Sequence, residues 1–248
     1  MNKVNQIDSV TNIYSDCIEL IAPVGEKLEE LLSNNHSEDY ITVGYDILKR
    51  IKGNLEILRW LPIEENSIVS IRLITRSIIG DLITSIFLLT RESTEELSNV
   101  LYNLDCKYVK SIRCFLKDRN ELYNFGRRRK GEKIISNEEF LSEFDEKFKG
   151  YEGKYKNYTL KEMAKEIGEC NHIELSALEY LYTEYRFLSQ TEHYCRKNRI
   201  FSYCFDNNSI IQHSKVINHS IKLLIQIINI WIEHKEFKSS LFKDLGNI

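Results

Sequence analysis

The chain has 248 residues, of which 42% are hydrophobic and 29% are charged, so it can bury a core and is not a mostly disordered chain. Its 34 basic and 37 acidic residues give a net charge of −3, which excludes a general attraction to nucleic acid or to an anionic membrane. Only two prolines and ten glycines occur. Because both residues break helices, their scarcity predicts long helices rather than a turn-rich β-architecture.

Apolar residues recur at steps of three and four along the first half of the chain, which is the spacing of amphipathic helices. This spacing predicts helices over residues 8–33 and 38–61, and two further helices are predicted over residues 67–91 and 93–123. The third is almost wholly apolar, so we expect it at the centre of the fold. The fourth begins at Ser93, which forms a capping-box pattern with Glu96.

The composition changes at residues 126–158, where charges of both signs are dense and four of the ten glycines fall. We expect a solvated insertion or long connection here, with a short helix that begins at Ser136. A further helix start is predicted at Thr159, and the last two long helices over residues 173–198 and 209–234. The sequence therefore predicts one all-α domain over residues 1–248, a bundle of six or seven helices.

The sequence favours a protein that is not secreted. The first residues, MNKVNQIDSVTN, lack the apolar segment of a secretory signal. The six cysteines include no C-x-x-C pair, a pattern typical of reduced, buried cysteines. Polar residues interrupt the most apolar stretch, residues 209–232, so we expect a buried helix there and no membrane association. Together these features predict a cytoplasmic protein.

Charged residues interrupt the apolar helix RLITRSIIGDLITSIFLL, notably Arg72, Arg76 and Asp81. A buried charge is costly unless it is paired, so we expect these side chains to meet partners on another helix. Two interpretations remain open. The residues form either an internal Arg–Asp ion pair that fixes helix register or part of a functional site.

A second polar group lies in YTEYRFLSQTEHYCRKNR, residues 182–199. If this stretch is one helix, the seven steps from Arg186 to His193 sum to about 700°, within about 20° of two turns. The two side chains then share one line along the helix, with Ser189 between them. Their spacing, six intervening residues, resembles the Arg-x4-6-His motif of the HEPN superfamily. Members of that superfamily are compact all-α bundles, often paired as dimers.

Many HEPN proteins are metal-independent ribonucleases of bacterial toxin–antitoxin and phage-defence systems, and others are inactive binding modules. In this sequence Phe187 follows the arginine, where the nuclease motif often has a polar residue. The wider pattern of RSIIGD and YRFLSQTEH, over roughly residues 67–235, also resembles all-helical bacterial proteins known only as a domain of unknown function. The resemblance implies that the chain is an endoribonuclease or an RNA-binding protein, and a possible homodimer.

The chemistry that the HEPN resemblance implies is coherent. His193 would deprotonate the 2′-hydroxyl of RNA, Arg186 would donate to the phosphate, and Asp81 would orient the histidine. Single-stranded RNA, or another phosphate-containing ligand, is the expected partner, and aromatic rings would stack on its bases. The expected substrate-binding residues are Arg76, Tyr182, Tyr185, Ser189, Arg196 and Arg199. The alternative is a non-catalytic interaction or regulatory protein in which the same residues form a buried network.

Metal binding is the competing class of site. Candidate ligands in and beside the last two predicted helices are Cys170, His172, Glu192, His193, Cys195, His213 and His219. No Glu-x-x-His pair repeats and no H-E-x-x-H occurs. The six residues that separate His213 from His219 leave them about 120° apart around a helix. We therefore expect neither a metal nor a cofactor.

Overall fold

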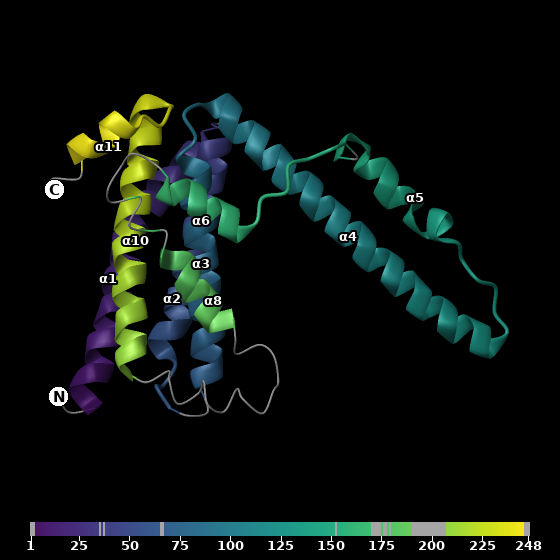
Figure 1. Ribbon diagram of the computed structural model, residues 1–248, viewed down its shortest axis with the longest axis horizontal. Helices are drawn as coiled ribbons and strands as arrows, with labels where there is room; N and C mark the ends of the chain where they lie inside the picture. The colour runs from purple at the N-terminus through teal and green to yellow at the C-terminus, as the bar shows by residue number, and fades with distance from the viewer. Residues whose placement is uncertain are drawn as a thin grey trace. The chain divides into compact units, whose positions relative to one another are not determined.

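The computed structural model describes residues 3–34, 36, 38–64, 67–151, 153–169, 175, 178, 180–189 and 207–245. These residues form helices joined by irregular segments, with no β-strand among them, so the predicted all-α fold is confirmed. The helices of Figure 1 are α1 (Lys3–Ser33), α2 (Asp39–Trp60), α3 (Ile68–Leu89), α4 (Thr94–Lys130), α5 (Asn137–Lys147), the 3₁₀-helix η1 (Lys149–Tyr151), α6 (Leu160–Gly168), α8 (Tyr180–Ser189), α10 (Asn207–His234) and α11 (Ser239–Leu245).

Nine α-helices occur within these described ranges, whereas the sequence predicted six or seven. The seven-residue α11 was not expected, because so short a segment has little hydrophobic periodicity. The predicted helix over residues 173–198 is represented by α8 and by isolated described positions, and its C-terminal part lies outside the described residues.

The chain divides into two compact units. The first unit comprises residues 1–97 and 159–248, and the second comprises residues 98–158. The predicted insertion, residues 126–158, lies inside the second unit, which also contains most of α4. That the whole chain is a single domain stays a prediction.

The first unit is a bundle in which α3 is central, as its apolar sequence predicted. α3 packs against α2, α6, α8 and α10, while α1 packs against α2 and α10 (Figure 1). On α10, the Trp231 indole is fully buried, stacks on Tyr40 with ring centroids 5.1 Å apart, and donates a 2.7 Å hydrogen bond to the Leu89 carbonyl. α10 is thus a core helix. None of the helices in the described part of the chain combines the length and the apolarity that a membrane span needs.

In the second unit, α5 and the segments beside it return antiparallel to α4. Arg113 on α4 donates hydrogen bonds to Asp145 of α5. Two turns further along α4, Asn120 donates a 2.9 Å hydrogen bond to Asn137 at the start of α5. Few apolar side chains are buried in this unit, Leu141 being one. Polar contacts therefore contribute much of its cohesion.

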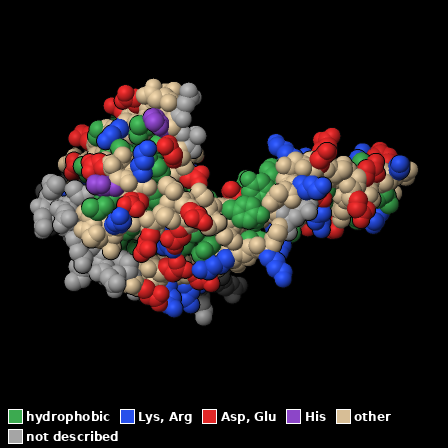
Figure 2. Space-filling model, turned by 90° about the horizontal axis from the view of Figure 1, so that it is seen from above, with side chains coloured by type: hydrophobic (Ala, Val, Ile, Leu, Met, Phe, Trp, Pro, Cys, Tyr) green, Lys and Arg blue, Asp and Glu red, His purple; other side chains and the backbone are tan. Residues whose placement is uncertain are grey.

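Side chains of both charges are interspersed over the face of the molecule in Figure 2.

The helix α4 extends beyond its predicted end and includes the whole basic run RRRK, residues 127–130. It ends in a Schellman motif, in which the Gly131 amide donates to the Arg128 carbonyl and the Glu132 amide to the Arg127 carbonyl. Gly131 has a φ of 71°, a left-handed conformation that glycine adopts without strain. The basic run therefore lies in the last helical turn, where cations complement the helix dipole.

Candidate functional site

A pocket of about 470 Å³ opens on α3 beside α6 and α8, and we call it the α3–α8 pocket. Three of its lining residues are among the predicted site residues. The lining comprises Leu73, Arg76, Ser77, Gly80, Asp81, Thr84, Leu160 and Tyr185. Gly80 leaves room for α8 here, because a Cβ at this position would lie 3.4 Å from the Tyr185 ring.

Arg76 is held against Tyr185 in this pocket. Its Nη2 donates to the tyrosine hydroxyl at 2.9 Å, and its Cζ lies 4.9 Å from the ring centroid. The Tyr185 ring also stacks on Tyr182, with centroids 6.4 Å apart. The structure thus brings together three of the predicted substrate-binding residues, and the aromatic contacts fix the orientation of the Arg76 guanidinium.

Asp81 pairs with Arg50 of α2, a partner that sequence reasoning missed. Arg50 Nε donates to Oδ2 at 3.0 Å, and its Nη2 contacts Oδ1. The hydrogen bonds that Arg50 donates to Asp81 raise the pKa of Arg50 above its ordinary value, although burial acts in the opposite direction. As expected for a buried charge, Asp81 meets a partner on another helix. Its predicted role of orienting His193 stays a prediction.

The residues of the HEPN-like motif are only partly within the described chain. Arg186 is exposed on α8 and is not among the residues that line the α3–α8 pocket. Ser189 donates its hydroxyl proton to the Tyr185 carbonyl at 2.7 Å, within its own helix. His193, Arg196 and Arg199 lie outside the described residues. The alignment of Arg186 with His193 is therefore still a prediction.

His213 is a buried histidine close to α8, and the sequence indicated only a metal-binding role for it. His213 on α10 is 5% exposed, and its Nε2 lies 2.6 Å from Oε2 of Glu184 on α8. Its Nδ1 faces the Ser209 carbonyl, so each ring nitrogen lies close to an oxygen atom of another residue. The hydrogen bond from His213 lowers the pKa of Glu184, against the effect of burial.

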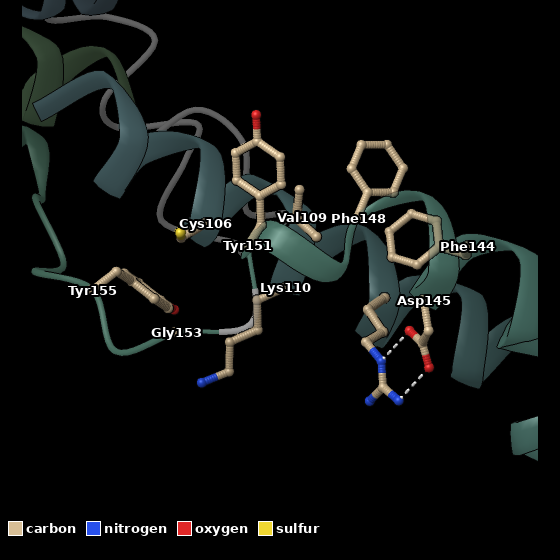
Figure 3. Close-up of a pocket in the computed structure, with 10 residues that line it drawn as sticks. Cys106, Val109, Lys110, Phe144, Asp145, Phe148, Tyr151, Gly153 and Tyr155 are labelled. Carbon is tan, nitrogen blue, oxygen red and sulfur yellow. Dashed lines mark hydrogen bonds and ion pairs between the residues drawn. The ribbon is translucent and has the colours of Figure 1, made fainter. Parts of the chain in front are cut away.

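The second unit contains a further pocket, of about 430 Å³, which we call the aromatic pocket (Figure 3). Four of its residues are aromatic and two are basic. The lining comprises Cys106, Val109, Lys110, Arg113, Phe144, Asp145, Phe148, Tyr151, Gly153 and Tyr155. Phe144 and Phe148 contact each other with centroids 4.8 Å apart. The pocket has the size of a site for a small ligand.

Two cations border the aromatic pocket. Arg113 forms a bidentate pair with Asp145, with Nε–Oδ1 2.6 Å and Nη2–Oδ2 2.7 Å, and this pair lowers the pKa of Asp145 (Figure 3). The exposed Lys110 ammonium lies 5.6 Å from the ring centroid of Tyr155. Sequence reasoning missed this pocket because it treated the region as a solvated connection.

Comparison with known proteins adds no assignment: no family model, no curated protein and no solved structure matches the chain. In the part of the chain that the structure describes, no group of three or more His, Cys, Asp or Glu side chains is arranged to hold a metal ion.

Proposed function

We propose that the protein binds single-stranded RNA and that the aromatic pocket accepts one of its unpaired bases. The observation that carries the proposal is the combination of aromatic walls and flanking charge in one unit. Residues 98–158 contain 14 basic and 10 acidic residues, a net charge of +4 in a chain whose total is −3. Single-stranded nucleic acid is typically held by stacking on aromatic rings beside cations that follow the phosphates.

The side chains of the aromatic pocket match this combination of stacking rings and phosphate-binding cations. Three of its aromatic rings are partly exposed, those of Phe148, Tyr151 and Tyr155. A base can therefore contact each ring without any change in the fold. Lys110, exposed beside Tyr155, is placed to meet a phosphate of the same nucleotide. Because stacking depends on the π-face that every base has, little sequence preference is expected.

The α3–α8 pocket supports a second, phosphate-binding contact. Arg76 lines this pocket, as does Asp81, the partner of Arg50, and the guanidinium fork of an arginine matches phosphate oxygens. Tyr185, which orients Arg76, directly precedes Arg186 on α8. Arg186, to which the HEPN resemblance assigns the phosphate contact, is therefore the sequence neighbour of a residue that lines the pocket.

Cleavage of the bound RNA follows from that resemblance. His193 would take the proton of a 2′-hydroxyl, and the 2′-oxygen would attack the adjacent phosphorus. The bond to the 5′-oxygen then breaks, and that oxygen takes up a proton from water. The products are a cyclic phosphate and a 5′-hydroxyl, while Arg186 stabilises the charge on phosphorus. The same resemblance implies that the protein acts in the cytoplasm, in a bacterial defence or toxin–antitoxin system.

The second candidate function is a non-catalytic interaction or regulatory protein. It is favoured by the burial of polar side chains in the first unit, where Arg72 is 2% exposed and Asp81 6% exposed. The Arg50–Asp81 pair and the His213–Glu184 pair link different helices. Such pairs can serve only to fix helix register, because fold and burial alone do not specify a function.

Fluorescence anisotropy with labelled oligouridine tests RNA binding. Tyr155→Ala should weaken binding about 5- to 150-fold, the range expected for the loss of one stacked base. Tyr123→Ala removes an exposed tyrosine of α4 that is not in the pocket lining and should leave the affinity unchanged. Wild-type protein that does not bind the RNA, or equal loss in both variants, contradicts the proposal.

Cleavage is tested separately by incubating RNA with the protein in the presence of a chelator, beside Arg186→Ala and His193→Ala. Chelator-resistant cleavage that both substitutions abolish supports the ribonuclease. Intact RNA, together with lowered melting temperatures for both variants, favours the structural network. Cleavage that stops with the chelator assigns the reaction to a metal site instead.

A further inference from the structure

The helix α4 carries a row of large apolar side chains on the side turned away from α5. Tyr108, Phe115, Leu122 and Phe125 are 67%, 59%, 74% and 57% exposed, and Leu104, in line with them, is half-buried. At about 100° per residue these positions centre roughly opposite the side chains that face α5, such as the buried Asn120. We call this row the outer stripe.

The spacing of the outer stripe is that of a helix-pairing seam. Tyr108, Phe115 and Leu122 recur every seven residues, and Leu104 and Phe125 occupy the intermediate positions of the same heptads. The stripe is about 31 Å long, from 21 residues at about 1.5 Å each. A second helix laid along it would cover all five side chains at once.

We propose that the outer stripe pairs with the same stripe of a second copy of this chain, antiparallel and with Phe115 on the two-fold axis. The spacing is symmetric about Phe115 to within one residue: Tyr108 and Leu122 lie seven residues to either side, Leu104 eleven before and Phe125 ten after. A two-fold interface requires such symmetry because each contact must occur twice. In this register Leu104 faces the partner's Phe125, and Tyr108 faces the partner's Leu122. Apolar residues thus meet apolar residues throughout.

The polar positions of the stripe select the antiparallel orientation. Ser111 and Asp118 are exposed and lie between the apolar residues. An antiparallel pair sets Ser111 within one residue of the level of the partner's Asp118, where the hydroxyl can donate to the carboxylate. A parallel pair would instead set Asp118 against the partner's Asp118, and like charges would repel.

The area available is sufficient for a specific but modest interface. Five side chains that each expose roughly 100 Å² contribute about 500 Å² per chain, hence about 1,000 Å² in total, the lower limit of specific interfaces. We therefore expect a dimer that dissociates in the micromolar range. The inference does not depend on RNA binding.

Analytical ultracentrifugation over a concentration series tests the pairing. The wild type should sediment as a dimer of the 29.3 kDa chain at high concentration. Phe115→Glu should raise the dissociation constant at least about thirtyfold, with an unchanged circular dichroism melt. Ile134→Glu, at another exposed apolar residue of the same unit, should dimerise as the wild type does. A monomeric wild type, or a Phe115→Glu variant that dimerises normally, overturns the proposal.

Two further variants test the orientation and the pairing face. Ser111→Lys would bring an ammonium against the partner's Asp118 twice per antiparallel dimer and should tighten it, whereas in a parallel dimer the two new cations would repel. A weaker dimer for Ser111→Lys contradicts the antiparallel arrangement. The exposed Cys114 lies beside Phe115 and so tests the pairing face in either orientation: a short bis-maleimide should link two chains through it, and linkage that survives Cys114→Ser contradicts pairing through the outer stripe.

Discussion

The ion pair between Arg50 and Asp81 is asymmetric in burial. The Asp81 side chain is 8% exposed and the Arg50 side chain 67% exposed. Arg50→Ala therefore leaves a buried carboxylate without its charged donor. Asp81→Asn leaves a guanidinium that water can solvate, and the new amide oxygen can still accept one hydrogen bond. We predict that the first substitution destabilises the fold more than the second.

The magnitudes follow from the exposure of each group. Removing one partner of a fully buried ion pair costs about 3–5 kcal/mol, and the open side of this pair lowers the expected cost of Arg50→Ala to about 2–4 kcal/mol. Asp81→Asn should cost about 1 kcal/mol or less, because the Arg50 charge is screened by solvent. In a chain of this size each kcal/mol corresponds to roughly 2–4 °C in melting temperature.

Urea denaturation at neutral pH, followed by circular dichroism, gives both losses. The double variant should lose no more stability than Arg50→Ala alone, because the buried carboxylate that causes the loss is then neutral. Equal destabilisation by Asp81→Asn and Arg50→Ala would contradict the asymmetric burial of the pair. An unchanged free energy of unfolding for both variants would show that the pair does not stabilise the fold.

Helix starts were the most predictable part of the fold, because capping is local chemistry. Ser93 accepts a hydrogen bond from the Glu96 amide at 3.2 Å. Thr159 and Glu162 form a complete capping box, with the Thr159 amide donating to the Glu162 carboxylate at 2.8 Å. The position of α3 was also predictable, since a helix that is apolar on all sides must be covered on all sides.

The partners of the buried charges were not predictable in the same way. Hydrophobic periodicity shows which face of a helix is buried but not which helix covers it, so it could not identify Arg50 as the partner of Asp81. The aromatic pocket had a visible signal, in that Phe144, Phe148, Tyr151 and Tyr155 are spaced by three or four residues. Dense charge around them pointed to a solvated segment instead.

Three further predictions concern individual side chains. Trp231→Phe should cost about 1–3 kcal/mol in urea denaturation, because it removes the donor to the buried Leu89 carbonyl; an unchanged midpoint would exclude that role. The pKa of Glu184 is lower in the folded chain, so its contribution to stability is full above the unfolded value of about 4.3 and is lost as pH falls through the folded value. Glu184→Gln should therefore flatten the acid side of the stability–pH curve, and an unaltered curve would contradict the ion pair. Burial raises the pKa of Cys17 to about 12, so iodoacetamide at mildly alkaline pH should modify the exposed Cys114 and spare Cys17, as mass spectrometry of the peptides would show.

Photocrosslinking tests the central proposal, RNA bound in the aromatic pocket, most directly. RNA that contains 4-thiouridine should crosslink to the full chain on irradiation, and the modified peptides can be identified by mass spectrometry. We predict crosslinks to peptides that contain Tyr151 or Tyr155, competed by unlabelled single-stranded RNA and not by duplex RNA. Crosslinks found only elsewhere in the chain, or equally competed by duplex RNA, would contradict the assignment of this pocket to an unpaired base.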